Sequence, residues 1–204
     1  GGDAMGFRKW PSGTARAAGA RLESTAVAGQ GTPATALLAR QRVPHALHPY
    51  DVAADTPDYG AAVARALGVA PDRVFKTLVA QVDGELTVAV VPVTGGLDLK
   101  ALAAVAGGKR ATLAERAVAE RATGYVRGGI SPLGQRRKLP TVIDSSVERF
   151  DTVFVSAGRR GLQVELAPAE LIRLTSATLA PLSTAAPASG RAAPDEAAAP
   201  DEAG

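Results

Sequence analysis

The sequence predicts a mixed α+β domain whose strands pair mainly in antiparallel fashion. Its clearest signal is a hairpin, in which strand-like residues 74–82 and 85–93 flank Asp83-Gly84, a pair typical of two-residue turns. Residues 152–156 and 162–166 form a second expected pair, joined by a tight turn that contains glycine. Short helical segments alternate irregularly with these strands, which favours an α+β domain over repeated βαβ units.

Capping residues and glycines mark the ends of the expected helices. Thr32-Pro33 is typical of an N-cap followed by proline at the first helical position, and Asp98 is a second expected N-cap. Glycine follows three of the segments at their C-terminal ends. The expected helices are residues 33–42, 58–67, 99–106, 114–123 and 168–174, the further expected strands are residues 45–50 and 139–143, and residues 128–134 are an expected loop.

Composition divides the chain into three parts. Residues 1–31 lack a sustained hydrophobic period, which predicts a disordered extension, and the residues before Met5 resemble an expression scar. Residues 184–204 are rich in Ala, Pro, Asp and Glu, which predicts a disordered acidic tail. The folded domain is therefore expected over residues 32–183.

Composition also excludes several kinds of site. The chain of 204 residues contains no cysteine, which excludes disulfides, thiolate metal sites and a cysteine nucleophile. His45 and His48 are the two histidines, and in a strand they would lie on opposite faces, so we expect no metal site and no other cofactor. No apolar stretch reaches the ~18 residues of a membrane span. We expect a cytoplasmic protein without a membrane partner.

The charge distribution indicates a polyanionic partner. The net charge is +3, and the segment between Glu120 and Asp144 contains basic residues but no acidic one. Arg136, Arg137 and Lys138 are consecutive in this segment. Such a stretch suits a nucleic-acid backbone, and it also suits a solvated loop, so charge alone leaves both interpretations open.

Two features of the sequence could carry chemistry. Lys76 lies within an expected strand on the face of Val74 and Leu78, where a lysine either extends its ammonium to water or meets an anion. The glycine-rich loop at 128–134 lacks the spacing of a phosphate-binding loop. Its backbone amides could hold a carbonyl or an oxyanion, or the loop could be only a tight turn.

A series of motifs runs in order from about Thr32 to Ser183. They are TPA at 32–34, VFKTL at 74–78, LDLK at 97–100, TGY at 123–125, GGISPLGQ at 128–135, LPTVID at 139–144 and VSAGRRGL at 155–162. This series resembles the YbaK/EbsC family of trans-editing aminoacyl-tRNA deacylases, relatives of the editing domain inserted in bacterial prolyl-tRNA synthetases. The combination of GGISPLGQ with LPTVID is specific, whereas the Lys-Thr pair alone is weak.

The resemblance implies a fold, an activity and a set of site residues. The fold would be a mostly antiparallel, β-barrel-like core wrapped by helices. Activity would depend on Lys76, and Arg136, Arg137 and Lys138 would contact the tRNA backbone. The implied substrate-binding residues are Tyr50, Tyr59, Thr77, Gly128, Gly129, Ile130, Ser131, Pro132, Ser156, Gly158 and Gln163.

Within the family, the likeness is strongest to the branch that removes cysteine from mischarged tRNA for proline. In that branch the substrate's own thiol attacks its ester, so no protein nucleophile is required. The implied partners are the 3′ aminoacyl-adenosine end of a misacylated tRNA and prolyl-tRNA synthetase in a ternary complex. Two alternatives stay open: a deacylase that uses water on Ala-tRNA or another misacylated tRNA, and a non-catalytic module that binds tRNA or a synthetase.

Three positions depart from the family pattern. Ala157 stands where a second glycine is usual, and Tyr59 stands where phenylalanine is common. Gln163 stands where aspartate is usual, which removes a carboxylate from the implied pocket and weakens any transfer of amino-group recognition.

Overall fold

The computed structural model describes residues 31–185 of the chain. The disordered extension and the acidic tail that we expect fall almost wholly outside these residues, and both stay predictions. Within the described range, no helix is long and apolar enough to cross a membrane.

Helices and strands alternate along the described residues. The helices are α1 (Pro33–Arg40), α2 (Tyr59–Leu67), α3 (Leu99–Val105), α4 (Arg116–Thr123) and α5 (Pro168–Thr175), with 3-10 turns at Pro71–Arg73 and Ser145–Arg149. The strands are β1 (His45–Pro49), β2 (Phe75–Val82), β3 (Glu85–Pro92), β4 (Gly95–Leu97), β5 (Ala111–Leu113), β6 (Thr141–Asp144), β7 (Val153–Arg159), β8 (Leu162–Leu166), β9 (Thr178–Ala180) and β10 (Ser183–Ala185).

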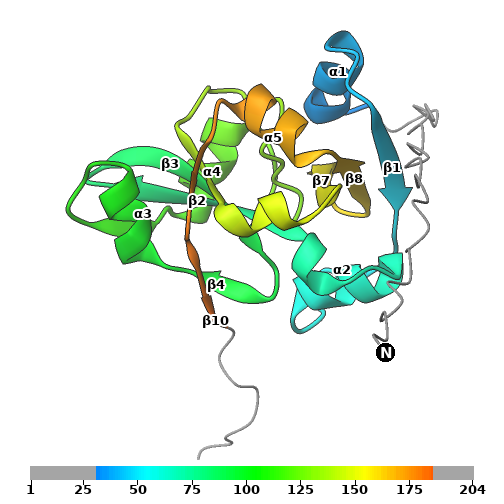
Figure 1. Cartoon of the computed structure of the whole chain (residues 1–204), viewed down its shortest axis with the longest axis horizontal. Coiled ribbons are helices and arrows are strands. Elements are labelled where there is room, and N and C mark those ends of the chain that lie inside the picture. The colour runs from blue at the N-terminus through cyan, green and yellow to red at the C-terminus, as the bar shows by residue number, and fades with distance from the viewer. Residues whose placement is uncertain (1–30, 186–204) are drawn as a thin grey trace, which may run out of the picture.

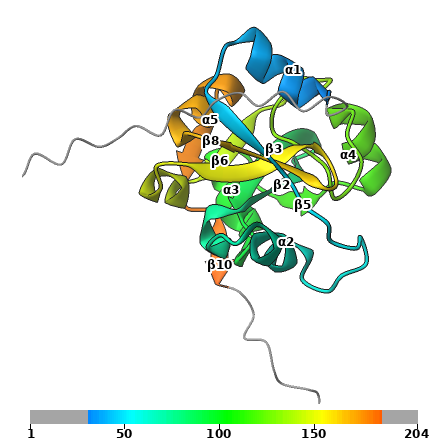
Figure 2. The same ribbon diagram turned by 90° about the vertical axis from the view of Figure 1, so that its right-hand side faces the viewer.

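The described strands form three sheets and do not close into one barrel. Their orders are β5-β2-β3-β6-β9, β1-β8-β7 and β10-β4. Pairing is antiparallel except at β3–β6 and β6–β9, so the expected α+β class with mainly antiparallel strands is confirmed. The helices surround the strands, as Figures 1 and 2 show, with α1, α4 and α2 at the periphery of the second view.

The hairpin β2–β3 forms as the turn signature predicts. Asp83 and Gly84 both have positive φ, 49° and 92°, which matches the twist that two-residue hairpin turns require. The Asp83 carboxylate also accepts hydrogen bonds from the backbone amides of Lys109 and Arg110, at 2.8 and 3.0 Å. The turn therefore also fixes the segment that leads into β5.

Both faces of β3 are buried, which makes it a central strand. Val88 and Val90 pack into one apolar cluster, whereas Ala89 and Val91 pack into a second cluster beside α3. Lys76 of β2 pairs with Val91, so it lies at one end of the face that packs into the second cluster. Lys76 therefore shares its strand face with Leu78 and Ala80, as expected, and it lies near the start of β2, where a pocket opens.

The second strand pair differs from expectation at its turn. β7 continues through Arg159, beyond the expected end at 156, and its register with β8 shifts between Ser156 and Arg159. This bulge changes the twist and spacing of the strands locally. The methyl group of Ala157 is fully buried in the first cluster, and the Ala157 carbonyl accepts a hydrogen bond from Thr32 Oγ1 at 2.5 Å.

Candidate active site

A pocket of about 500 Å³ brings together β2, the start of α2, the β5–α4 segment, the loop after α4 and the β7–β8 sheet. A parallel bridge between Val74, directly before β2, and Phe154 of β7 connects the five-stranded sheet with the three-stranded sheet beside this pocket. The residues that line it are Tyr59, Gly60, Val63, Val74, Phe75, Lys76, Thr77, Leu78, Val79, Val93, Leu113, Ala114, Arg116, Ala119, Glu120, Arg127, Gly128, Ile130, Ser156 and Gln163.

Lys76 is a half-buried cation in this pocket. Burial lowers the pKa of its ammonium, and the nearby Asp58 carboxylate partly opposes that change. Among the described residues Lys76 has no ion pair within 4.0 Å. The ammonium is therefore placed to meet an anionic group of a ligand.

Three buried polar side chains line the same pocket. Ser156 and Gln163 lie opposite each other across β7 and β8, and Thr77 follows Lys76 on β2. Ser156 Oγ accepts a hydrogen bond from the Gly158 amide at 3.2 Å. Thr77 Oγ1 and Gln163 Oε1 have no hydrogen-bond partner within the described part of the chain. Buried polar atoms are rarely left unpaired, so these two oxygens are exceptions within the described fold.

Two tyrosines meet beside the start of α2: Tyr59 is its first residue, and Tyr50 directly follows β1. The hydroxyls of Tyr50 and Tyr59 are 2.9 Å apart and hydrogen bonded, and the ring of Tyr59 lines the pocket while that of Tyr50 does not. Burial, together with the bond to Tyr50, raises the pKa of the Tyr59 hydroxyl. The hydroxyl that distinguishes Tyr59 from phenylalanine thus has a partner in Tyr50, which holds the Tyr59 ring at the pocket wall.

The glycine-rich loop divides into pocket-lining and supporting residues. Gly128 and Ile130 line the pocket, whereas Gly129 does not, and the Gly129 amide donates to the Val126 carbonyl at 2.9 Å. A Cβ on Gly129 would come within 2.8 Å of the Arg159 backbone. Glycine at this position therefore lets the loop pack closely against the end of β7.

Ser131, Pro132 and Gly158 support the loop from outside the pocket. Ser131 and Pro132 are buried, and Ser131 Oγ accepts a hydrogen bond from the Leu133 amide at 3.2 Å. Gly158 has a φ of 104°, and a Cβ there would lie 2.7 Å from the Tyr125 ring. Of the implied substrate-binding residues, these three, Tyr50 and Gly129 lie behind the pocket lining.

Arginines at the pocket entrance were missed by the sequence reasoning. Arg116 and Arg127 line the pocket, and Arg160 packs against Gly128. Glu120 accepts hydrogen bonds from Arg116 Nε and from the Arg127 amide, both at 2.9 Å. These contacts lower the pKa of the Glu120 carboxyl, with the Arg127 amide as the largest cause. The acid-free stretch of sequence already contained Arg127, whereas nothing in the local pattern singled out Arg116.

The basic triplet Arg136, Arg137 and Lys138 is exposed and does not line the pocket. Its position is fixed through the backbone, because the Arg136 and Arg137 amides donate to carbonyls of α4 at 2.9 and 3.1 Å. The Arg136 side chain lies beside Gly124, at the end of α4. The triplet is thus attached to the helix whose start borders the pocket.

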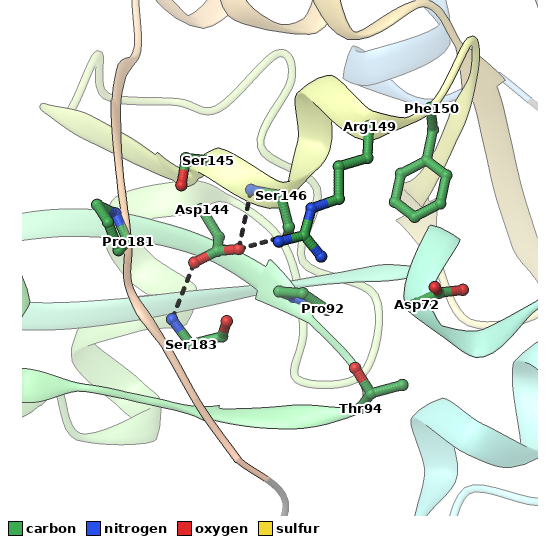
Figure 3. A pocket seen from close by; sticks show the side chains of 10 residues that line it. All are labelled: Asp72, Pro92, Thr94, Asp144, Ser145, Ser146, Arg149, Phe150, Pro181 and Ser183. Carbon is green, nitrogen blue, oxygen red and sulfur yellow. Dashed lines mark hydrogen bonds between the residues drawn. The ribbon is translucent and has the colours of Figure 1, made fainter.

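A second pocket, of about 240 Å³, surrounds Asp144 (Figure 3). The buried Asp144 carboxylate accepts hydrogen bonds from the Leu182 and Ser183 amides at 2.7 and 2.9 Å. It also accepts bonds from the amide and hydroxyl of Ser146. Burial tends to raise the pKa of Asp144, but these bonds outweigh it and hold the pKa below its ordinary value. Because its acceptors are occupied, Asp144 is a structural carboxylate rather than a ligand site.

Comparison with known proteins identifies the family to which this chain is similar. A family model described as the aminoacyl-tRNA editing domain matches residues 54–174, which is more than half of the chain. EbsC of Enterococcus faecalis is 41% identical over 125 residues, which cover 60% of this chain and 75% of EbsC. The name of EbsC provisionally assigns it as a Cys-tRNA(Pro)/Cys-tRNA(Cys) deacylase.

Two further similarities agree with this match. ProXp-y of Escherichia coli, named a multifunctional Ser/Thr-tRNA deacylase, is 34% identical over 123 residues, which cover 58% of this chain and 74% of ProXp-y. A crystal structure described provisionally as a trans-editing enzyme for prolyl-tRNA synthetase has a TM-score of 0.69 at 21% identity, covering 78% of this chain and 99% of its own, and it shows the shared fold. The chain described here belongs to the aminoacyl-tRNA editing domain family.

Proposed function

We propose that this protein is an aminoacyl-tRNA deacylase that cleaves the ester of a mischarged tRNA in the pocket lined by Lys76. One observation carries the proposal: a half-buried lysine without an ion pair among the described residues lines a pocket whose other polar lining includes Thr77, Ser156 and Gln163. The cation suits phosphate or ribose oxygens of the terminal adenosine. The neutral polar side chains of Thr77, Ser156 and Gln163 in the same lining suit the amino acid.

The substrate we propose is Cys-tRNA(Pro), and its own thiol is the nucleophile. The chain has no cysteine, and the residues that line the pocket include no histidine. The sulfur would attack the ester carbonyl, a C–S bond would form, and the C–O bond to the ribose would break. The thiol proton would pass to the leaving ribose oxygen. Alignment of the reacting atoms can supply up to ~7–11 kcal/mol in favourable cases.

The protein groups would act by positioning and by electrostatics. Lys76 would fix the adenosine end, and the backbone amides of Gly128 and Ile130 would face the ester carbonyl. These two amides have no backbone acceptor in the described part of the chain, whereas the Gly129 amide is already bonded. Loss of one donor to a developing oxyanion typically costs about 3–4 kcal/mol of transition-state stabilisation.

The tRNA body would lie across the basic surface near the pocket entrance. Arg116, Arg127 and Arg160 surround the entrance, and the triplet Arg136, Arg137 and Lys138 extends this charge along the other end of α4. Such a surface attracts phosphates but does not read tRNA identity. A ternary complex with prolyl-tRNA synthetase, which binds the tRNA specifically, would supply that selectivity.

The test compares deacylation of cysteinyl, seryl and alanyl esters on tRNA(Pro). Wild type should release cysteine fastest, and Lys76→Ala should reduce this rate by about 100-fold or more. Lys100→Ala, an exposed lysine on α3, is the matched control and should leave the rate unchanged.

The outcomes separate the alternatives. Release of alanine at a rate similar to cysteine would replace the thiol mechanism with attack by water. Absence of turnover with every ester would refute a deacylase and favour a binding module. Near-full activity of Lys76→Ala would refute the role given to Lys76.

A further inference from the structure

We infer that Arg73 is a positioning residue, which fastens the start of β2 to β7 and thereby sets where Lys76 stands in the pocket. Arg73 acts within a clamp that comprises Arg73, Thr152, Glu165 and His48, none of which lines the pocket of Lys76. The effect of the clamp on turnover rests on the proposed function, whereas its effect on the position of Lys76 does not. The inference adds residues outside the pocket on which its chemistry depends.

Arg73 holds the residue that precedes β7. Its Nε and Nη2 atoms donate to the Thr152 carbonyl at 3.2 and 3.1 Å, and Nη2 also donates to Thr152 Oγ1 at 2.6 Å. The guanidinium carbon lies 5.2 Å from the centre of the Phe154 ring. Several donors on one rigid, planar group fix an orientation as well as a distance, which a lysine ammonium does not do.

Glu165 and His48 hold the other side of this contact. Thr152 Oγ1 donates to Glu165 Oε1 at 2.6 Å, and the same carboxylate oxygen lies 3.5 Å from Arg73 Nη2. Glu165 Oε2 accepts a hydrogen bond from His48 Nε2 at 2.8 Å, and the ring centres of His48 and Phe154 are 5.2 Å apart. The clamp therefore connects β1 and β8 with the 3-10 turn that contains Arg73.

The clamp lies directly before the pocket on β2 and on β7. Arg73 precedes Val74, which forms an isolated parallel bridge with Phe154. Lys76 lies two residues beyond Val74, Ser156 lies two residues beyond Phe154, and both line the pocket. Residues two apart on a strand point to the same side. Because a single bridge provides little backbone pairing, the contacts of Arg73 decide how Lys76 and Ser156 face each other.

Strand β8 repeats this arrangement. Glu165 pairs with Phe154, and Gln163 pairs with Ser156, so the two residues of β8 lie on one face of the sheet. The first pair contacts Arg73, and the second pair lines the pocket. A displacement of about 1 Å in a positioned group can cost ~100-fold in rate. Loosening of the clamp should therefore slow a reaction that depends on Lys76.

The titration of Lys76 reports its position. Burial is the largest cause of its lowered pKa, and the Asp58 carboxylate opposes it. A looser clamp would admit water to Lys76, so its pKa should rise toward ~10.4, the ordinary value for lysine. Arg73→Lys keeps the positive charge but loses the planar group, and Thr152→Val removes only a hydroxyl. Neither variant changes the net charge, so a rise in pKa would report the position of Lys76.

The experiment titrates the Lys76 ammonium by NMR in full-length protein that carries isotope-labelled lysine. A Lys76→Arg partner of each protein identifies the signal. Thr152→Val and Arg73→Lys should both raise the pKa of Lys76, whereas Thr152→Ser, which keeps the hydroxyl, should match wild type. Asp144→Asn, in the second pocket, is the control for lost stability and should leave the titration unchanged.

Turnover of Cys-tRNA(Pro) provides a second readout. Thr152→Val and Arg73→Lys should lower kcat by about 10- to 100-fold, because the pocket groups are misplaced. They should change KM by less than about 3-fold, because the basic surface that would bind tRNA is untouched. Thr152→Ser and Asp144→Asn should keep the kcat of wild type.

An unchanged pKa of Lys76 in either folded clamp variant would overturn the inference, and Arg73→Lys decides if Thr152→Val fails to fold. An equal rise in Asp144→Asn would also overturn it, because that result indicates general loosening of the fold. The titration does not depend on turnover. A raised pKa in the variants of a protein that deacylates no ester would therefore support the clamp and refute the proposed catalysis.

Discussion

Lys76 illustrates how the surroundings of one residue decide its chemistry. Its neighbours on the same strand face, Leu78 and Ala80, pack into a buried cluster, whereas Lys76 ends that face at the pocket. Burial lowers the pKa of its ammonium, and the Asp58 carboxylate limits the change. The residue therefore stays a candidate for anion binding whose charge is lost at a lower pH than that of an exposed lysine.

This pKa shift predicts an alkaline limit to activity. The charged form of Lys76 exists below its folded-state pKa and is lost as the pH rises through it. The alkaline decrease of kcat/KM for Cys-tRNA(Pro) should therefore occur at a pH below ~10.4, the ordinary pKa of lysine. Lys76→Arg keeps its charge to a higher pH, so its profile should extend upward even where its maximum is lower. Rates corrected for spontaneous ester hydrolysis would check this. Coincident alkaline limits for the two proteins would contradict the assignment.

The hydroxyl pair of Tyr50 and Tyr59 predicts an energetic coupling. Each single change to phenylalanine leaves the partner hydroxyl without this bond and should destabilise the fold by about 0.5–1.5 kcal/mol. The double variant should be less destabilised than the sum of the single changes. Urea unfolding of the four proteins gives the coupling directly, and strict additivity would show that the bond contributes nothing to stability.

Elements with local signals were predictable, and elements that depend on distant partners were not. The β2–β3 hairpin and the end of α2 at Gly68 follow from turn and capping residues. Strands β4, β5, β9 and β10 have three residues each, too few to show a period-2 pattern. The parallel pairing of β6 with β3 and β9 joins segments far apart in sequence, so no local pattern contains it.

The same distinction between local signals and distant contacts applies to the candidate site. The pattern around Lys76 already placed a lysine on an apolar strand face, and the family resemblance supplied Thr77 and Gln163 as pocket residues. That Gln163 has an unpaired Oε1, or that Arg116 borders the entrance, follows only from how β8 and α4 pack around β2. Tertiary packing decides these contacts, and sequence spacing does not contain them.

Asp144 joins β6 to the segment between β9 and β10, which predicts a stability effect at the level of the sheet. Asp144→Asn should lower the free energy of unfolding by about 1–3 kcal/mol, because a charged acceptor of the Leu182, Ser183 and Ser146 donors is lost. The folded-state pKa of Asp144 is depressed, so this contribution is present above about pH 4 and is lost as the pH falls through that pKa.

Thermal or urea unfolding from neutral to acidic pH would measure this effect. The difference between wild type and Asp144→Asn should narrow as the pH falls. Asp72→Asn changes an exposed carboxylate in the same pocket and should have little effect at any pH. A difference that stays constant with pH would show that the charge of Asp144 is not what stabilises the sheet.

At the scale of the whole molecule, the location of the basic residues is more informative than the net charge. The net charge is only +3, yet arginines border the pocket entrance and the exposed triplet lies at the far end of α4. Exposed basic residues Lys100, Lys109 and Arg110 lie elsewhere, on α3 and the segment after it. If tRNA contacts the surface around the pocket, these two groups of equal charge should differ in their effect on binding.

The matched comparison replaces Arg136, Arg137 and Lys138 with alanine in one variant, and Lys100, Lys109 and Arg110 in the other. Both changes remove three positive charges, so a general electrostatic effect would weaken tRNA(Pro) binding equally. Direct phosphate contacts at the triplet should instead weaken binding mainly in the first variant. Loss of these contacts should also reduce the slope of log Kd against log salt concentration by up to about 2–3 in the first variant, since each contact to phosphate contributes ~0.7–0.9 to that slope. Titrations from about 50 to about 300 mM salt would measure both quantities, and equal slopes in the two variants would place the tRNA backbone elsewhere on the molecule.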